Sequence, residues 1–124
     1  MESTQASISI QRAQALLASA DLSSAISDFD YGLQCAQQAQ DLFQQLGDQQ
    51  GEIDARLKYC ELARLAGELE NLQGQAEEAL RIAEQLSYAA GIAQAKLMLG
   101  SISYFAGENQ VAVQYLLPSG LLAK

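Results

Sequence analysis

An all-α fold of antiparallel helix pairs, stacked as an α-solenoid, is predicted by three features of the 124-residue sequence. The composition favours helix, because Ala, Leu, Gln and Glu are abundant and there is a single Pro. Apolar residues recur three and four positions apart over most of the chain, which is the spacing of one helix face. The whole pattern repeats after about 40 residues, a period typical of helical-repeat proteins.

The repeat divides a single domain, 1–124, into units at about 4–46, 47–86 and 87–124. When the chain is shifted by one repeat, the positions that align are mostly apolar or small. They include Ala15, Ala55 and Ala95, then Leu17, Leu57 and Leu97, then Leu22, Leu62 and Ile102, and the blocks Ala66-Gly67-Glu68 and Ala106-Gly107-Glu108. Because a helix pair cannot bury its apolar face alone, we expect the units to stack on one another.

The first two units each predict two helices. A helix near 4–21 carries the first apolar stripe, and the helix near 24–46 carries a longer one, Phe29, Gly32, Ala36, Ala39, Phe43 and Leu46. The helix near 48–66 has two stripes, which are Ala55, Tyr59, Leu62 and Ala66, and Ile53, Leu57 and Cys60. We expect a helix that is apolar on two sides to have neighbours on both. The helix near 68–86 repeats the single stripe as Leu69, Leu72, Ala76, Ala79, Ala83 and Leu86.

The third unit predicts a helix near 88–106 and a shorter one near 108–117, which Pro118 should end. Asp48 and Ser87 are predicted N-caps, and Gly67 and Gly107 stand where a left-handed residue would end a helix. Three pairs with the acid four positions before the base predict ion pairs on exposed helix faces. They are Glu52–Arg56, Asp54–Lys58 and Glu77–Arg81.

The pattern resembles the tetratricopeptide repeat (TPR), in particular the longer units found in bacterial regulatory proteins and kinesin-light-chain-like arrays. The third unit carries the resemblance best, through Leu99-Gly100, Gly107-Glu108-Asn109, Ala112, Leu116 and Ser119. The second unit fits at Gly67, Ala76 and Ala79 but has Tyr59-Cys60 in place of Leu-Gly. The resemblance implies a right-handed superhelix of about three units, with the first helix of each unit lining a concave groove that binds proteins.

Mapped onto this sequence, the concave positions of the family give candidate partner-binding residues on the first helices of the second and third units. They are Asp54, Leu57, Glu61, Arg64, Leu97, Ser101, Tyr104 and Phe105. Leu57 and Leu97 are equally interpretable as core residues, and Phe105 more readily so. Leu also replaces the first clamp residue of members that bind acidic tails, and Lys58 and Met98 replace the Asn ladder of others. An apolar stripe with acidic edges suits a peptide or helix that is not acidic.

Catalysis is not expected, and neither a cofactor nor a metal is predicted. The chain has no His, so it lacks an imidazole base and the Glu-x-x-His motif of helical di-metal sites. Pairs of acids such as Glu77/Glu78 diverge on a helix and are interpreted as solvated surface. Cys35 and Cys60 fall at apolar positions and are interpreted as small core residues.

Charge and hydropathy exclude other partners. The formal net charge is −8, which would repel the phosphate backbone of nucleic acid. No apolar run reaches the roughly 18 residues that would indicate a membrane span, and no signal peptide is recognisable. We therefore expect a cytoplasmic protein without nucleic-acid or membrane partners.

The C-terminal segment, 116–124, contains four Leu residues, and no polar helix follows it to cap the stack. Either the chain is a piece of a longer array, or this segment self-associates with another copy. Three functional hypotheses remain at this point. The chain is a non-catalytic interaction scaffold, the N-terminal regulatory module of a larger signalling protein such as a kinase, cyclase or transcription regulator, or a homo-oligomeric helical bundle.

Overall fold

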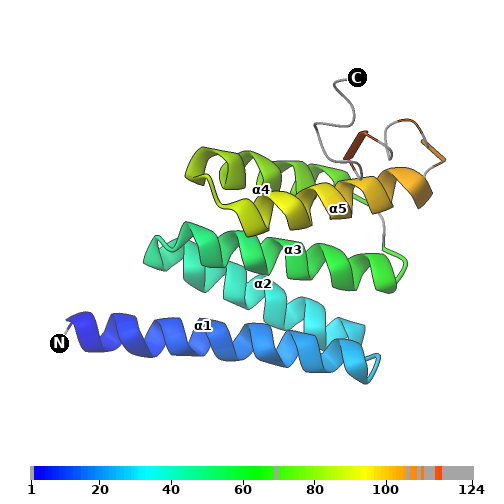
Figure 1. Ribbon diagram of the computed structural model, residues 1–124. Coiled ribbons are helices and arrows are strands. Elements are labelled where there is room, and N and C mark those ends of the chain that lie inside the picture. The colour runs from blue at the N-terminus through cyan, green and yellow to red at the C-terminus, as the bar shows by residue number, and fades with distance from the viewer. Residues whose placement is uncertain (1, 69, 106, 109, 111–113, 116–124) are drawn as a thin grey trace.

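The computed structural model describes residues 2–68, 70–105, 107–108, 110 and 114–115, and their side chains except at 2–7, 24 and 105. Within these residues the fold is all-helical, as predicted, and has five helices and no strand (Figure 1). The helices are α1 (Glu2–Ala25), α2 (Phe29–Leu46), α3 (Gln49–Leu65), α4 (Leu72–Leu86) and α5 (Ala89–Phe105).

Consecutive helices run antiparallel and pack against each other along the chain (Figure 1). Contacts also join alternate helices, α1 to α3 and α3 to α5. In Figure 1 the order in space follows the order in sequence, from α1 at one end to α4 and α5 at the other. The middle helix, α3, therefore contacts all four of the others.

The turns that end the helices recur at half the period of the sequence repeat. Each contains one residue of positive φ: Ser27 (60°), Gly47 (73°), Gly67 (81°), Ser87 (56°) and Gly107 (82°). In every case the next residue donates its backbone N–H to the carbonyl five positions back, over 2.8–2.9 Å. This is the hydrogen bond of a Schellman helix end. The same local structure thus recurs five times, which gives the backbone a repeat-like character.

Small residues bring the helices close together. Several alanines of α1, α2 and α4 have no exposed surface, among them Ala20, Ala36, Ala39, Ala76, Ala79 and Ala83. Larger fully buried side chains fill the remaining space, and these are Ile53, Leu62, Leu72 and Leu99. Gly51 is also needed for close approach, because a Cβ there would overlap the Phe43 ring of α2.

Cys35 and Cys60 are buried in this core as free thiols, in agreement with the sequence interpretation. Burial raises the pKa of the Cys60 thiol to about 11, against a weaker opposing effect of the Arg56 charge. Such a thiol stays protonated near neutral pH and is a poor nucleophile.

Some local predictions are wrong. Ser87 does not cap α5, because its left-handed backbone ends α4 instead. The helix predicted near 68 begins at Leu72, since Asn71 has a φ of 63° that interrupts the helix. The helix predicted to end near 21 continues to Ala25.

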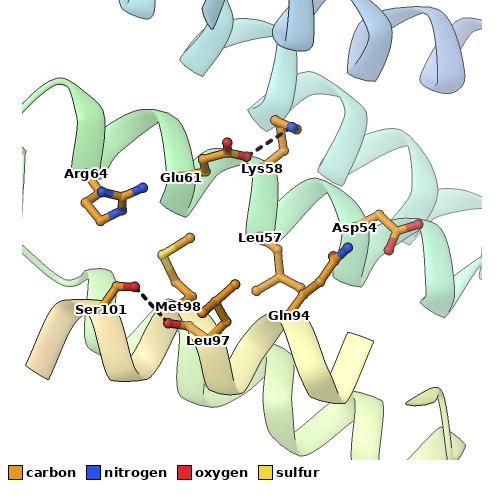
Figure 2. Close-up of a pocket in the computed structure, with 9 residues that line it drawn as sticks. All are labelled: Asp54, Leu57, Lys58, Glu61, Arg64, Gln94, Leu97, Met98 and Ser101. Carbon is orange, nitrogen blue, oxygen red and sulfur yellow. Dashed lines mark hydrogen bonds and ion pairs between the residues drawn. The ribbon is translucent and has the colours of Figure 1, made fainter. Parts of the chain in front are cut away.

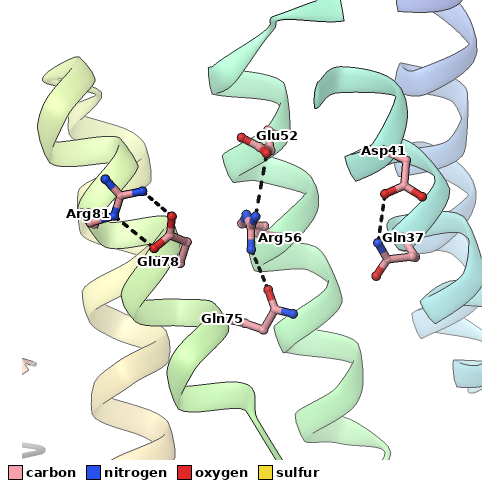
Figure 3. Close-up of polar contacts among 7 residues, drawn as sticks. All are labelled: Gln37, Asp41, Glu52, Arg56, Gln75, Glu78 and Arg81. Carbon is pink, nitrogen blue, oxygen red and sulfur yellow. Dashed lines mark hydrogen bonds and ion pairs between the residues drawn. The ribbon is translucent and has the colours of Figure 1, made fainter. Parts of the chain in front are cut away.

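Of the three predicted ion pairs, Glu52–Arg56 forms at 3.8 Å (Figure 3), but both side chains are largely buried and not on an exposed face as predicted. Asp54–Lys58 and Glu77–Arg81 are replaced, because the bases find acids at other positions. Lys58 pairs with Asp21 and with Glu61, and Arg81 pairs with Glu78. Within each helix, the base thus pairs with an acid three positions away and not with the acid four positions away.

The C-terminal segment 116–124 and most of the helix predicted at 108–117 lie outside the described residues. Across the part of the chain that is described, no helix is both long and apolar enough to cross a membrane.

Candidate functional site

A groove of about 360 Å³ lies between α3 and α5 (Figure 2). We refer to it as the α3–α5 groove. Its lining residues come from both helices and are Asp54, Leu57, Lys58, Glu61, Arg64, Gln94, Leu97, Met98 and Ser101. Both helices are first helices of predicted units, and they are brought together by the contact between α3 and α5.

Six of the eight predicted partner-binding residues line this groove. Asp54, Leu57, Glu61 and Arg64 come from α3, and Leu97 and Ser101 come from α5. Tyr104 lies in the last turn of α5 and is not part of the lining, although its side chain is 63% exposed. The side chain of Phe105 lies outside the described residues.

Three lining residues are not among the eight candidates, and these are Lys58, Gln94 and Met98. Lys58 and Met98 each directly follow a candidate residue, Leu57 or Leu97, and the two are one repeat apart. Because an α-helix has 3.6 residues per turn, positions three and four apart share one face. The signal was therefore present in the spacing, since Lys58 stands four positions after Asp54 and Met98 four after Gln94.

The two leucines at equivalent repeat positions have different environments. Leu57 is 5% exposed and packs in a core cluster with Ile53 and Ile82. Leu97 is 58% exposed. Leu57 therefore serves both as core and as the base of the groove, whereas Leu97 offers its apolar surface to solvent or to a ligand.

Lys58 links α3 to α1. Its ammonium pairs with Asp21 of α1 and donates to Glu61 Oε2 over 3.0 Å, and in Figure 2 it points away from α5. Burial opposes the charged form, but the two carboxylates outweigh this and raise the pKa of Lys58 above its usual value. Lys58 thus remains charged and is engaged by acids of the protein itself.

Asp54 lies at the end of the groove opposite Arg64 (Figure 2), and its carboxylate accepts a hydrogen bond of 2.9 Å from the hydroxyl of Tyr88. Burial raises the pKa of Asp54, and this exceeds the lowering by the Tyr88 hydrogen bond. The nearby Asp48 charge raises it further. The carboxylate is therefore held in place yet incompletely compensated, so a cation near it would be favoured.

The groove brings together charged, polar and apolar side chains. Its lining contains carboxylates, one ammonium, one guanidinium, an amide, a hydroxyl and apolar groups. The Ser101 hydroxyl donates to the Leu97 carbonyl over 2.9 Å, and the sequence has no His to act on it as a base. Within the described residues, no group of three or more His, Cys, Asp or Glu side chains could hold a metal ion.

No protein-family model matches this sequence, and no curated protein or solved structure matches it either. The function of the α3–α5 groove therefore has to follow from the chemistry of its own residues.

Proposed function

We propose that this chain is a non-catalytic protein-interaction module of TPR-like type, which binds a peptide or helix of a partner protein in the α3–α5 groove. The observation that carries the proposal is the groove itself, in which an exposed apolar side chain, Leu97, is surrounded by fixed charged groups. Apolar anchors with a few placed polar groups are the usual chemistry of peptide recognition by helical grooves.

The proposal includes a right-handed solenoid as the architecture. Support comes from the five equivalent turns, which recur at regular intervals, and from the contacts that join α1 to α3 and α3 to α5. Each helix pair then contacts its neighbours in the stack, which is how repeat proteins bury a continuous core.

The partner segment should carry an apolar anchor and should not be acidic. Among the groove acids, Glu61 is paired with Lys58, whereas Asp54 accepts from the neutral hydroxyl of Tyr88. The formal net charge of −8 also disfavours an acidic ligand at long range. A Lys or Arg next to the apolar anchor would complement Asp54.

Selection of a random peptide library on the immobilised chain tests this proposal. The expected peptides combine Leu, Ile, Phe or Met with Lys or Arg and are poor in Asp and Glu. Leu97→Glu should weaken their binding by at least about tenfold, because it places a charge on the apolar wall of the groove. The affinities would be measured by titration with a labelled selected peptide.

Leu22→Glu is the matched control, since Leu22 is a similarly exposed leucine on α1, away from the groove. It should leave the affinity unchanged. Circular dichroism of both variants checks that they are folded. Equal weakening by the two variants, or a selection dominated by acidic peptides, would contradict the proposal.

A further inference from the structure

Asp54 is an acid of the α3–α5 groove that pairs with no base among the described residues. Lys58 stands one turn further along the same face of α3, but Asp21 and Glu61 bind its ammonium instead. In Figure 2 that ammonium is directed toward Glu61 and not toward Asp54. The charge of the Asp54 carboxylate is therefore available to a cation that a bound partner supplies.

Tyr88 occupies one oxygen of this carboxylate. Its hydroxyl donates to Asp54 Oδ1 over 2.9 Å. The ring of Tyr88 packs against the core cluster that contains Ile53 and Ile82. Gly91 of α5 leaves room for the ring, because a Cβ at that position would stand 2.6 Å from Tyr88 Cδ2. Packing of the ring thus fixes the donor at Oδ1.

The second oxygen, Asp54 Oδ2, accepts no hydrogen bond from the described residues and is not enclosed by them. A Lys ammonium is a compact point charge, for which one acceptor oxygen is sufficient. An Arg guanidinium binds a carboxylate best through two parallel hydrogen bonds, one to each oxygen. The Tyr88 hydroxyl at Oδ1 therefore interferes with the binding mode of Arg more than with that of Lys.

An apolar wall lies next to the carboxylate. Leu57 and Leu97 line the groove from α3 and α5, and in Figure 2 both lie between Asp54 and Arg64 at the opposite end. Long cationic side chains commonly lay their methylene stems on apolar surface while the charged head stays in a polar environment. A Lys stem along these leucines would bring its ammonium to Asp54.

We propose that the Asp54 end of the groove is a subsite for a Lys side chain of the partner, and that Tyr88 is the positioning residue that makes this subsite prefer Lys to Arg. The inference rests on the function proposed above and narrows the class of its ligand. The partner segment then carries a Lys beside its apolar anchor, and an Arg in the same place binds less well.

Two small probes test the subsite without a peptide. Hexylammonium carries the charge of Lys and hexylguanidinium that of Arg, on the same alkyl chain. Each is titrated into the isotope-labelled chain, and binding is followed by NMR shifts of the backbone amides of 54–58 and 94–98. The wild type should bind hexylammonium about two- to fivefold more tightly than hexylguanidinium. Tyr88→Phe should remove this preference, because it frees Oδ1 for the second hydrogen bond of the guanidinium.

Two matched substitutions separate the subsite from the general attraction of an acidic protein for cations. Asp54→Asn should weaken the binding of both probes and abolish the preference between them. Asp41→Asn removes the same charge from an exposed position on α2, outside the groove, and should leave both affinities as in the wild type. Circular dichroism checks that the three variants are folded.

The outcomes distinguish this inference from the proposed function. A wild type that binds hexylguanidinium as tightly as hexylammonium, or a Tyr88→Phe variant that keeps the wild-type ratio, overturns the Lys subsite. If selected peptides nevertheless bind in the groove, the proposed function stands without it. If the probes behave as expected and no peptide binds, the subsite is supported and the proposed function is wrong.

Discussion

Helices α1 and α3 hold the same place in the first two predicted units of the sequence repeat but have opposite environments. Leu62 of α3 has no exposed surface, whereas Leu22, its equivalent in α1, is 69% exposed. Both lie in apolar stripes of the same spacing. An apolar stripe therefore indicates that a helix can pack against a neighbour on that face. Whether the side chain is buried depends on whether such a neighbour is in place.

Polar contacts also connect α3 to helices on both of its sides. Arg56 of α3 donates to Gln75 of α4 over 2.8 Å and pairs with Glu52 on its own helix (Figure 3). Lys58 of α3 reaches Asp21 of α1. The middle helix therefore holds its neighbours on both sides through ionic and hydrogen-bonded contacts as well as through its core, and Asp21 is the acid by which α1 joins this network.

The largest expected effect separates the two equivalent leucines. Leu62→Ala should lower the free energy of unfolding by about 2–5 kcal/mol, because it removes fully buried methyl groups and leaves a cavity. Leu22→Ala should change it by no more than about 0.5 kcal/mol in dilute protein. Urea unfolding at a protein concentration low enough to keep the chain monomeric measures both. Similar losses in the two variants would mean that α1 is covered as α3 is.

Two glycine-to-alanine substitutions should give the next largest changes in stability. Gly51→Ala on α3 should cost about 1–3 kcal/mol, since the new Cβ would overlap the ring of Phe43 and push α2 and α3 apart. Gly74→Ala on α4 is the control, because nothing lies within 4 Å of a Cβ at that position. It should instead stabilise the protein by about 0.5–1 kcal/mol through helix propensity. Thermal unfolding of the two variants shows whether they shift in opposite directions.

The Lys58 contact with α1 should have a smaller, pH-dependent effect. Because its carboxylate partners raise the pKa of Lys58 above the unfolded value, the stabilisation is present at neutral pH and is lost as the pH rises through the folded pKa. Lys58→Met should therefore reduce stability at pH 7, and this difference should disappear as the pH rises through the folded pKa of Lys58. Lys96→Met is the matched control, because Lys96 has no ion pair among the described residues, and it should not reduce stability at pH 7. Urea midpoints over this pH range provide the measurement.

The smallest expected effect concerns Asp54 on α3. Folding raises the pKa of Asp54, so the folded state disfavours the charged carboxylate. This lowers the free energy of unfolding at any pH above the folded pKa of Asp54. The loss is absent below its unfolded pKa, where the group is protonated in both states. Asp54→Asn should thus be slightly more stable than the wild type at pH 7 and equal to it near pH 3. Tyr88→Phe should act in the opposite direction at pH 7, because it removes the hydroxyl that donates to the carboxylate. Melting temperatures at the two pH values provide the measurement. A lower melting temperature of Asp54→Asn than of the wild type at pH 7 would contradict the prediction.

Much of the candidate site could be predicted from the resemblance to the TPR pattern, because the concave positions mapped from it fall on one face of each first helix. Six predicted residues from two helices line one groove, and the helix ends at Gly67 and Gly107 have the left-handed backbone expected of them. These features depend on periodicity and local conformation, which are encoded in consecutive residues. The start of α4 could not be predicted in the same way, because Asn71 has a left-handed φ that the apolar pattern around it does not indicate.

The sequence by itself determined that this protein is all-helical, that its helices repeat with a regular period, and which residues of α3 and α5 share a face. Only the tertiary structure decided that Leu57 is buried while Leu97 is exposed, and that Lys58 pairs with Asp21 on another helix and not with Asp54. The physical reason is that burial and ion pairing depend on residues far apart in the chain. A stripe on one helix cannot specify what lies opposite until the helices have packed.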